Sequence, residues 1–407
     1  MSATSTLDAE PNSIIAALME LPTTDPDPYP LYERLREIAP SHRSQYGLRF
    51  VSRYNDIHQL LRSPDFRIGM FEGDPRYDAS PWLQNASDFL AFSNPPKHDR
   101  LRALVSRAFT QRFLETHVGP LIDAVVDRNL TRCAASDTFD VVAELAVTVP
   151  AEVICELLGI PSEDQAKVVR WMEGIGQIFA PILTDATLAG ADHAIVESHQ
   201  YLDELINKRR RQPREDLLSK LVAVSSDDGR LTTTEVTNFT LQLLSAGSET
   251  TMNLIGIGTL VLLQRPDLLT RLRQRRELMT GVVDELLRFE PPVHITTLRT
   301  ATVDTTLGDH RIEQGEVVTG LVGAGNRDPA IFIDPNVFDT GRESERPPLT
   351  FGSGIHYCLG AALVKGVANR LFRGLLIERF PTLHITGEAV YRPGFWVRGL
   401  GRLELAQ

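Results

Sequence analysis

The chain has 407 residues, of which 42% are hydrophobic and 23% are charged, as is typical of a globular protein with a large buried core. The formal net charge of -11 argues against nucleic acid and anionic membranes as partners, because both select basic surfaces. Cys133, Cys155 and Cys358 show no C-x-x-C spacing and cannot all pair, which suits a reducing compartment. No signal peptide or membrane anchor is evident in the sequence, so we expect a cytoplasmic protein.

The polar, proline-rich residues 1–27 are expected to form a flexible segment, and residues 28–407 to form a single domain. Apolar residues recur with helical spacing in the segments 101–109, 118–130, 143–158, 191–211 and 236–263. Strand-like runs are short and lie at 48–52, 301–307, 311–321 and 383–385. These patterns predict a mainly α fold with small β-sheets.

The segment 95–102 (PPKHDRLR) contains His98 and Arg102 and opens a predicted helix. At about 100° per residue, Arg102 is turned about 200° from Arg100 on a helix, whereas Arg100 and Arg107 share a face. If Arg102 faces inward, Arg100 and Arg107 face outward with Arg112 nearby. These exposed arginines are expected to form a basic patch that steers an acidic protein partner.

The longest predicted helix covers residues 232–264, and Thr232 with Glu235 forms a capping-box sequence at its start. About 30 residues rising 1.5 Å each give about 45 Å, enough to cross a domain. Apolar residues on every side of this helix predict that it is buried. Gly256 and Gly258 each lower helix propensity by about 1 kcal/mol relative to alanine, so packing has to compensate.

Two groups of polar residues stand in this part of the chain. The segment 246–251 (AGSETT) places Glu249 beside Thr250 in the apolar middle of the long helix, which is costly unless the carboxylate is satisfied or used. From the residues alone, a neighbouring partner for Glu249 and a bond from Thr250 to the preceding turn are sufficient explanations. Glu285 and Arg288 are three residues apart, a spacing that on most helices forms an exposed ion pair.

The most informative stretch is residues 351–360 (FGSGIHYCLG), which presents the sulfur of Cys358 in a glycine-rich loop. Gly352, Gly354 and Gly360 are expected to let the backbone crowd a large, flat ligand, because glycine reaches positive φ without steric cost. A lone cysteine is usually a reactive thiol or a core residue. The glycine spacing and the helix-like run that follows instead indicate thiolate ligation of haem iron.

The 351–360 loop resembles the haem-binding signature of the cytochrome P450 family, F-x-x-G-x-x-x-C-x-G. The segment 246–251 resembles the oxygen-binding motif of the same family, A/G-G-x-D/E-T-T. The similarity runs from about Pro28 to Leu405 and includes residues 326–329 (NRDP). It implies the cytochrome P450 fold of the bacterial type, with haem b (iron protoporphyrin IX) between the long central helix and the cysteine loop.

The resemblance also implies roles for individual residues: Cys358 ligates the iron, Thr250 hydrogen-bonds the bound oxygen, and Glu249 relays protons from solvent. Other residues would hold the haem, with His98, Arg102, Arg299 and His356 at the propionates and Ala246, Gly247 and Phe351 around the ring. A buried structural ion cluster is implied for Glu285, Arg288 and Arg342.

The implied activity is that of a haem-thiolate monooxygenase, an oxidoreductase that acts on paired donors. It would insert one oxygen atom from dioxygen into a small organic substrate by hydroxylation or epoxidation. Electrons would come from NAD(P)H through a ferredoxin reductase and a ferredoxin, which the basic patch would attract. A mid-sized natural product of secondary metabolism, free or tethered to a carrier protein, fits the expected pocket.

By resemblance, the substrate pocket is walled by the segments 66–92, 171–194, 293–297 and 395–396 and by the middle of the long helix. The residues expected to contact substrate are Leu243, Ile295, Thr296 and Trp396. Further side chains expected in these walls are Met70, Phe71, Trp82, Phe179, His294 and Thr297.

Other functions are open to such a chain. The same fold can perform oxidative coupling or peroxide-driven oxidation, although Glu249 and Thr250 favour oxygen activation. A haem-binding sensor without turnover is a candidate from another class. A hydrolase using Cys358 and His356 is a third, but residues two apart on a loop rarely meet in attack geometry.

The sequence departs from the family pattern at two positions. Pro348 stands where bacterial relatives commonly have histidine, three residues before the phenylalanine of the cysteine loop, so one support of the segment around Arg342 is missing. Asn94 occupies a position often held by aspartate, and we expect little consequence.

Overall fold

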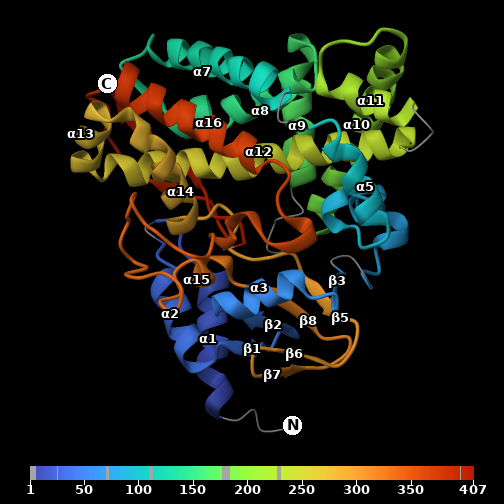
Figure 1. Cartoon of the computed structure of the whole chain (residues 1–407), viewed down its shortest axis with the longest axis vertical. Coiled ribbons are helices and arrows are strands. Elements are labelled where there is room, and N and C mark those ends of the chain that lie inside the picture. The colour runs from blue at the N-terminus through green and yellow to red at the C-terminus, as the bar shows by residue number, and fades with distance from the viewer. Residues whose placement is uncertain are drawn as a thin grey trace.

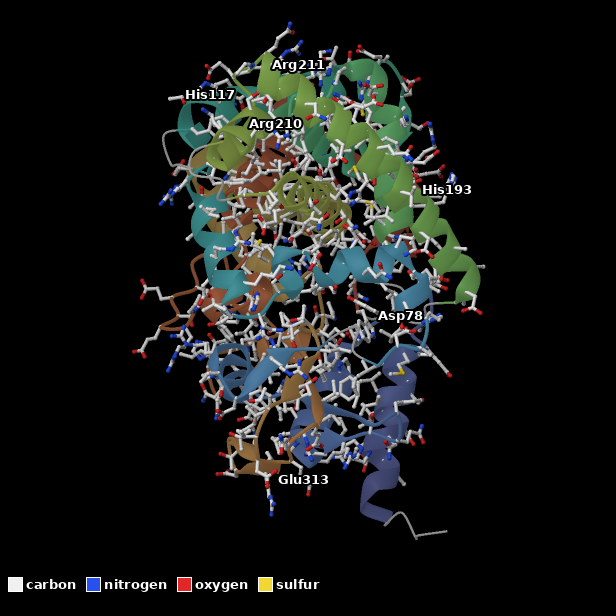
Figure 2. All side chains as sticks on the ribbon, turned by 90° about the vertical axis from the view of Figure 1, so that its right-hand side faces the viewer. Asp78, His117, His193, Arg210, Arg211 and Glu313 are labelled. Carbon is white, nitrogen blue, oxygen red and sulfur yellow. The ribbon has the colours of Figure 1, made fainter. Side chains whose placement is uncertain are left out.

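The computed structural model describes residues 6–24, 26–69, 73–109, 113–176, 184–226, 231–394 and 396–407. Helices fill the larger part of the molecule, and a smaller part carries the N-terminus and most of the strands (Figure 1). Charged side chains such as His193, Arg211 and Glu313 project from the surface (Figure 2). The prediction of a mainly α fold with small sheets is confirmed.

The helix α12 (Thr233–Leu263) runs through the helical part and packs against α8 (Thr148–Leu157), α9 (Gln165–Gly176), α10 (Asp185–Arg211) and α16 (Ala361–Arg373). The other α-helices are α1 (Thr6–Met19), α2 (Tyr29–Ile38), α3 (Tyr54–Arg62), α4 (Pro81–Ser87), α5 (Lys97–Ser106), α7 (Gly119–Cys133), α11 (Leu217–Ser226), α13 (Pro266–Gln274), α14 (Met279–Phe289) and α15 (Val322–Gly325). Among the described residues, none of these helices has the length and apolar character needed to cross a membrane.

The predicted long helix and its capping box are both present. The Thr232 hydroxyl accepts a hydrogen bond from the Glu235 backbone N–H at 3.1 Å, and the Glu235 carboxylate accepts one from the Thr232 N–H at 2.8 Å. Two of the N–H groups at the helix start are thereby satisfied. Most of the following residues are buried, as the all-round apolar pattern predicted.

The largest sheet has five short strands in the order β1 (Ser41–Arg43), β2 (Leu48–Val51), β8 (Val317–Gly320), β5 (Arg299–Ala301) and β3 (Phe66–Ile68). β2 and β8 are parallel, with Leu48 opposite Val317, and the other pairs are antiparallel. Strand β5 positions Arg299, whose side chain lies on the buried face. The remaining strands pair as β6 (Thr305–Leu307) with β7 (His310–Ile312), β10 (Val390–Tyr391) with β11 (Leu400–Arg402), and β4 (Thr138–Asp140) with β12 (Glu404–Ala406) and β9 (His384–Ile385).

The N-terminal segment differs from the flexible stretch expected over residues 1–27. Residues 6–19 form α1, and Ile15 and Leu18 on one face of this helix are 1% exposed. They pack in one buried cluster with Tyr32 and Leu35 of α2. Apolar residues three apart, here Ile15 and Leu18, are enough to anchor a short amphipathic helix, which the polar composition of the segment concealed.

The two glycines of α12 differ in the room around them, which gives a matched pair of variants. A Cβ at Gly258 would lie 2.5 Å from the ring of Phe372, which is fully buried in α16, whereas a Cβ at Gly256 would meet Leu400 at an ordinary 3.6 Å. We expect Gly258→Ala to lower the free energy of unfolding by about 1–3 kcal/mol through overpacking. Gly256→Ala should leave it unchanged or raise it by up to about 1 kcal/mol. Urea denaturation of the three proteins measures both changes, and equal effects would contradict this packing account.

Candidate functional site

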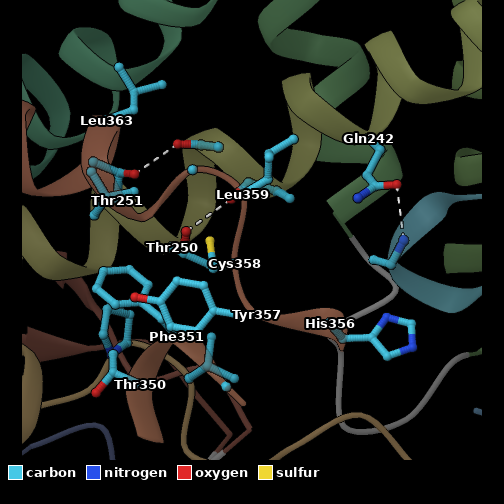
Figure 3. Close-up of a pocket in the computed structure, with 18 of the residues that line it drawn as sticks. Gln242, Thr250, Thr251, Thr350, Phe351, His356, Tyr357, Cys358, Leu359 and Leu363 are labelled. Carbon is cyan, nitrogen blue, oxygen red and sulfur yellow. Dashed lines mark hydrogen bonds between the residues drawn. The ribbon is translucent and has the colours of Figure 1, made fainter. Parts of the chain in front are cut away.

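A cavity of about 350 Å³ lies between α12 and the loop that precedes α16 (Figure 3). It brings together most of the site residues predicted from the sequence, although they are up to 260 positions apart in the chain. Those that line it are His98, Arg102, Leu243, Ala246, Gly247, Thr250, Ile295, Thr296, Arg299, Phe351, His356 and Cys358. Glu249 and Trp396 are not among its lining residues.

The backbone of the cysteine loop explains two of its three glycines. Gly352 and Gly354 have φ values of 72° and 71°, a region that residues with a side chain rarely adopt. The Cys358 N–H donates to the Phe351 carbonyl at 2.9 Å and closes the loop between them. Gly360 differs from the expectation of positive φ, because its φ is -85°. A Cβ there would come within 3.9 Å of the Cys358 sulfur.

The Cys358 sulfur lies just before the N-terminus of α16, which begins at Ala361. Burial raises the pKa of its thiol, whereas hydrogen bonding from the backbone of Gly360 and Ala361 and the charge of Arg102 lower it. N–H groups at a helix start favour an anionic sulfur. A bound metal ion would complete the deprotonation, as it does for coordinating thiols generally.

A group of cationic and imidazole side chains surrounds one end of the cavity: Arg102 and His98 from α5, Arg299 from β5, and His356 from the cysteine loop. The rings of His98 and His356 are 4.2 Å apart. Burial lowers the pKa of Arg299 to about 10. Burial, followed by the charge of Arg299, lowers the pKa of His356 to about 3.

Two nitrogen atoms in this group have no hydrogen-bond partner among the described residues. They are His98 Nε2 and Arg299 Nε, each in a side chain that is at most 3% exposed. An unsatisfied buried donor is costly, and a buried cation without a counter-charge is more so. Carboxylates bound here would give Arg299 a counter-charge, so the residues fit a haem: this group would hold the propionates, and Cys358 would ligate the iron.

The face of α12 across the cavity from the cysteine loop carries Ala246, Gly247 and Thr250. The Thr250 hydroxyl donates to the Ala246 carbonyl at 2.9 Å. A Cβ at Gly247 would lie 2.9 Å from Ile154 Cδ1 of α8. Close packing of α8 on α12 therefore requires this glycine in addition to any space that it leaves above a haem.

Glu249 does not line the cavity, so the carboxylate that was expected to relay protons is not directly beside the predicted iron site. Its Oε1 accepts a hydrogen bond from Arg392 Nη1 at 3.1 Å, and its side chain is 18% exposed. Burial raises the pKa of this carboxyl group, while Arg392 lowers it. Arg392 was not predicted from the sequence, since nothing local connects residues 143 positions apart.

The cluster of Glu285, Arg288 and Arg342 has the contacts that the family resemblance implied. The Arg288 guanidinium donates to both carboxylate oxygens of Glu285, at 2.6 and 2.8 Å, and Arg342 Nε donates to Oε1 at 3.2 Å. Arg288 also donates to the main-chain carbonyls of Asn326 and Pro335. Removing one member of such a buried network typically costs about 3–5 kcal/mol.

Asn326 was singled out only as part of a motif, and the structure gives it a specific contact. Its side-chain oxygen accepts from the Leu349 N–H at 2.7 Å, and its amide nitrogen donates to Thr350 Oγ1 at 2.9 Å. These bonds hold the start of the cysteine loop beside Pro348, where the sequence lacks the usual histidine. Asn94 is likewise satisfied, since its side chain bonds both the N–H and the carbonyl of Ile68.

The residues proposed for substrate contact separate into two sets. Leu243, Ile295 and Thr296 line the cavity, as does Thr297. Trp396 instead packs against the cluster around α1 and α2 and does not line it. Trp82 and His294 also lie outside the lining, buried in the core. Four residues of the predicted pocket walls lie outside the described residues: Met70, Phe71, Phe179 and Phe395.

The expected basic patch is smaller than the sequence indicated. Arg100 forms an ion pair with Glu235 at the start of α12, so its charge is compensated. Arg107 is exposed at the end of α5. Arg112 lies outside the described residues.

A cysteine just before a helix, facing a long helix across a cavity lined by unpaired nitrogen atoms, is the arrangement that a haem-thiolate protein requires, and the comparisons agree. A model of the Cytochrome P450 family matches residues 45–384. The chain is 34% identical over 383 residues to the biotin biosynthesis cytochrome P450 of Bacillus subtilis (strain 168), covering 93% of this chain and 95% of that protein. It is 37% identical over 393 residues to the cytochrome P450 monooxygenase PikC of Streptomyces venezuelae, covering 93% and 91%.

The structure of P450BioI in complex with an acyl carrier protein ligated to hexadec-9Z-enoic acid superposes with a TM-score of 0.87 at 32% identity, covering 94% of this chain and 98% of that one. The chain belongs to the cytochrome P450 family, and the protein is a cytochrome P450 monooxygenase.

Proposed function

We propose that this monooxygenase uses haem b to insert one oxygen atom from dioxygen into an unactivated bond of a mid-sized natural product. The observation that carries the proposal is the position of the Cys358 sulfur, which shares one cavity with Ala246 and Thr250 of α12. His98, Arg102, Arg299 and His356 would hold the propionates. Cys358 would supply the thiolate that ligates the iron.

When bound, the haem supplies the iron that activates dioxygen, with electron density donated by the thiolate. The chain supplies the proton path. Glu249 holds a proton more readily than an ordinary glutamate because burial raises its pKa. Arg392, at 41% side-chain exposure, connects this carboxyl group to solvent. Thr250 would give up its bond to the Ala246 carbonyl and pass the proton into the cavity.

The names of several relatives support a natural product as the substrate. They include a polyketide biosynthesis cytochrome P450 of Bacillus subtilis, a 6-deoxyerythronolide B hydroxylase of Saccharopolyspora erythraea and a nocardicin C N-oxygenase of Nocardia uniformis. The proposal includes substrates tethered to a carrier protein, because the P450BioI structure contains an acyl carrier protein ligated to a fatty acid. The three cysteines are unpaired and two are buried, which favours a reducing, cytoplasmic location.

The rival functions have less support. A hydrolase would need the imidazole of His356 beside the Cys358 sulfur, but the ring points away from the sulfur and toward His98 (Figure 3). A sensor without turnover has no use for a proton path, and peroxide-driven oxidation needs none to form the O–O group, because peroxide brings its own protons. The intact pair of side chains therefore favours oxygen activation.

The test of the haem-thiolate proposal is the absorption spectrum of the reduced, carbon monoxide-bound protein. The wild-type protein should show the band characteristic of thiolate ligation, and Cys358→Ala should abolish it because no other sulfur reaches the cavity from the described residues. Cys155→Ala is the matched control, since this thiol is buried in α8 away from the cavity. A band that survives in Cys358→Ala would end the proposal.

The proton path is tested by Thr250→Ala. We expect this variant to consume NAD(P)H and dioxygen but to release peroxide, with product per NAD(P)H lowered by on the order of tenfold, because the last proton donor is missing. Thr259→Ala is the matched control, since Thr259 makes the same bond to the preceding turn, at 2.8 Å, but does not line the cavity. Peroxide and product are quantified together, and unchanged coupling in Thr250→Ala would contradict the role.

We propose a ferredoxin as the electron donor, with Arg107 contributing to its attraction. Arg107→Glu should slow reduction by a bacterial ferredoxin and its reductase by about tenfold at low salt and should flatten the dependence on salt. Stopped-flow reduction under carbon monoxide measures both. Arg311→Glu, in β7 of the smaller part of the molecule, is the control charge reversal (Figure 1). Equal slowing in both variants would show that only the net charge of the protein matters, and it would exclude Arg107 from the docking surface.

A further inference from the structure

Gln242 of α12 lines the cavity and is held in one orientation by the backbone. Its Oε1 accepts a hydrogen bond from the Ala91 N–H at 3.2 Å, in the short helical segment Leu90–Phe92. A backbone N–H can only donate, so the side-chain oxygen must face Ala91. The amide nitrogen Nε2 therefore faces the other way, as the close-up of the cavity shows (Figure 3).

The two N–H groups of Nε2 have no acceptor among the residues that the structure describes. Three hydroxyl groups of the cavity lining, by contrast, already make hydrogen bonds within the protein. Thr250 and Thr251 donate to the carbonyls of Ala246 and Gly247 at 2.9 and 2.8 Å. Thr296 accepts from the Gly320 N–H at 2.9 Å. Gln242 thus offers the cavity a positioned donor that the protein itself leaves unused.

The position of Gln242 on the helix relates it to the reacting end of the cavity. Gln242, Ala246 and Thr250 are spaced by four residues, so successive members are rotated by about 40° and lie on one face. Each step rises about 6 Å, which puts Gln242 about 12 Å from Thr250 along the helix axis. A group bonded to Gln242 would leave the rest of a mid-sized molecule extending toward Thr250 and Cys358.

We propose that Gln242 determines substrate specificity by donating a hydrogen bond to a neutral acceptor oxygen, such as a ketone, ester or lactone carbonyl. The proposal rests on the monooxygenase function proposed above and narrows its substrate class. The acceptor would be anchored at the Gln242 end, and the carbon to be oxidised would lie toward Thr250.

The surroundings of Gln242 favour a neutral acceptor over a carboxylate. Its neighbours in the cavity wall are Leu90, Phe239 and Leu243, none of which can compensate a negative charge. A carboxylate taken into such surroundings without a cation is strongly destabilised, while a carbonyl needs only one donor. The cationic side chains of the cavity belong to the group around Arg299 and His356, which the haem propionates would occupy.

The test uses 1-alkylimidazoles with chains of 4 to about 12 atoms, in pairs with and without a terminal methyl ketone. The imidazole nitrogen ligates the ferric iron of the holoenzyme and shifts its spectrum, so each Kd is measured without turnover. We expect one chain length at which the ketone is favoured over its alkane partner in the wild-type protein. At that length Gln242→Leu should shift the ratio of the two Kd values by about fivefold toward the alkane, as expected for one hydrogen bond.

Gln242→Met separates the donor from the length of the side chain. The thioether keeps only a weak acceptor for the Ala91 N–H and offers the cavity no donor, so it should shift the ratio as Gln242→Leu does. A ratio unchanged in both variants at every chain length would overturn the proposal, and so would a shift in Gln242→Leu alone, which would assign the effect to the shape of the side chain. The reduced carbon monoxide spectrum of each variant reports an intact haem pocket, and its absence in the wild-type protein would instead refute the proposed function.

Discussion

The arrangement around the cavity depends on buried nitrogen atoms that have no hydrogen-bond partner among the described residues, His98 Nε2 and Arg299 Nε. These side chains come from a helix and a strand that are about 200 positions apart in the chain, and they meet at one cavity. Folding a chain around such groups is unfavourable unless a ligand compensates them, because a buried polar group loses its bonds to water. A ligand that carries carboxylates would supply the negative charge and the acceptors that these groups need.

The two walls of the cavity, the cysteine loop and α12, are held in place by different kinds of interaction. The cysteine loop depends on backbone geometry: positive φ at Gly352 and Gly354, one closing hydrogen bond, and the start of α16. The wall formed by α12 depends on side-chain packing, with Gly247 pressed against Ile154 and Gly258 against Phe372. The loop and the helix are therefore positioned by independent sets of interactions.

The sequence was sufficient wherever the signal is local. The capping box at Thr232, the long buried helix and the glycine-rich loop around Cys358 are each encoded within a few residues, and the structure has all of them. The sequence was insufficient where a contact joins distant segments. The bond from Arg392 to Glu249 spans 143 residues, and the one from the Ala91 N–H to Gln242 spans 151. Neither has a spacing or composition that could reveal it.

The anchoring of residues 326–350 has a consequence for how this enzyme can be altered. Arg288 and Arg342 tie the main chain ahead of the cysteine loop to α14, and Asn326 ties the loop start to the same region. None of these side chains lines the cavity, whereas Gln242, Leu243 and Ile295 do. The residues that line the cavity and the residues that hold the cysteine loop therefore belong to separate parts of the polypeptide. Gln242, Leu243 and Ile295 can be exchanged without changing the contacts that position the sulfur.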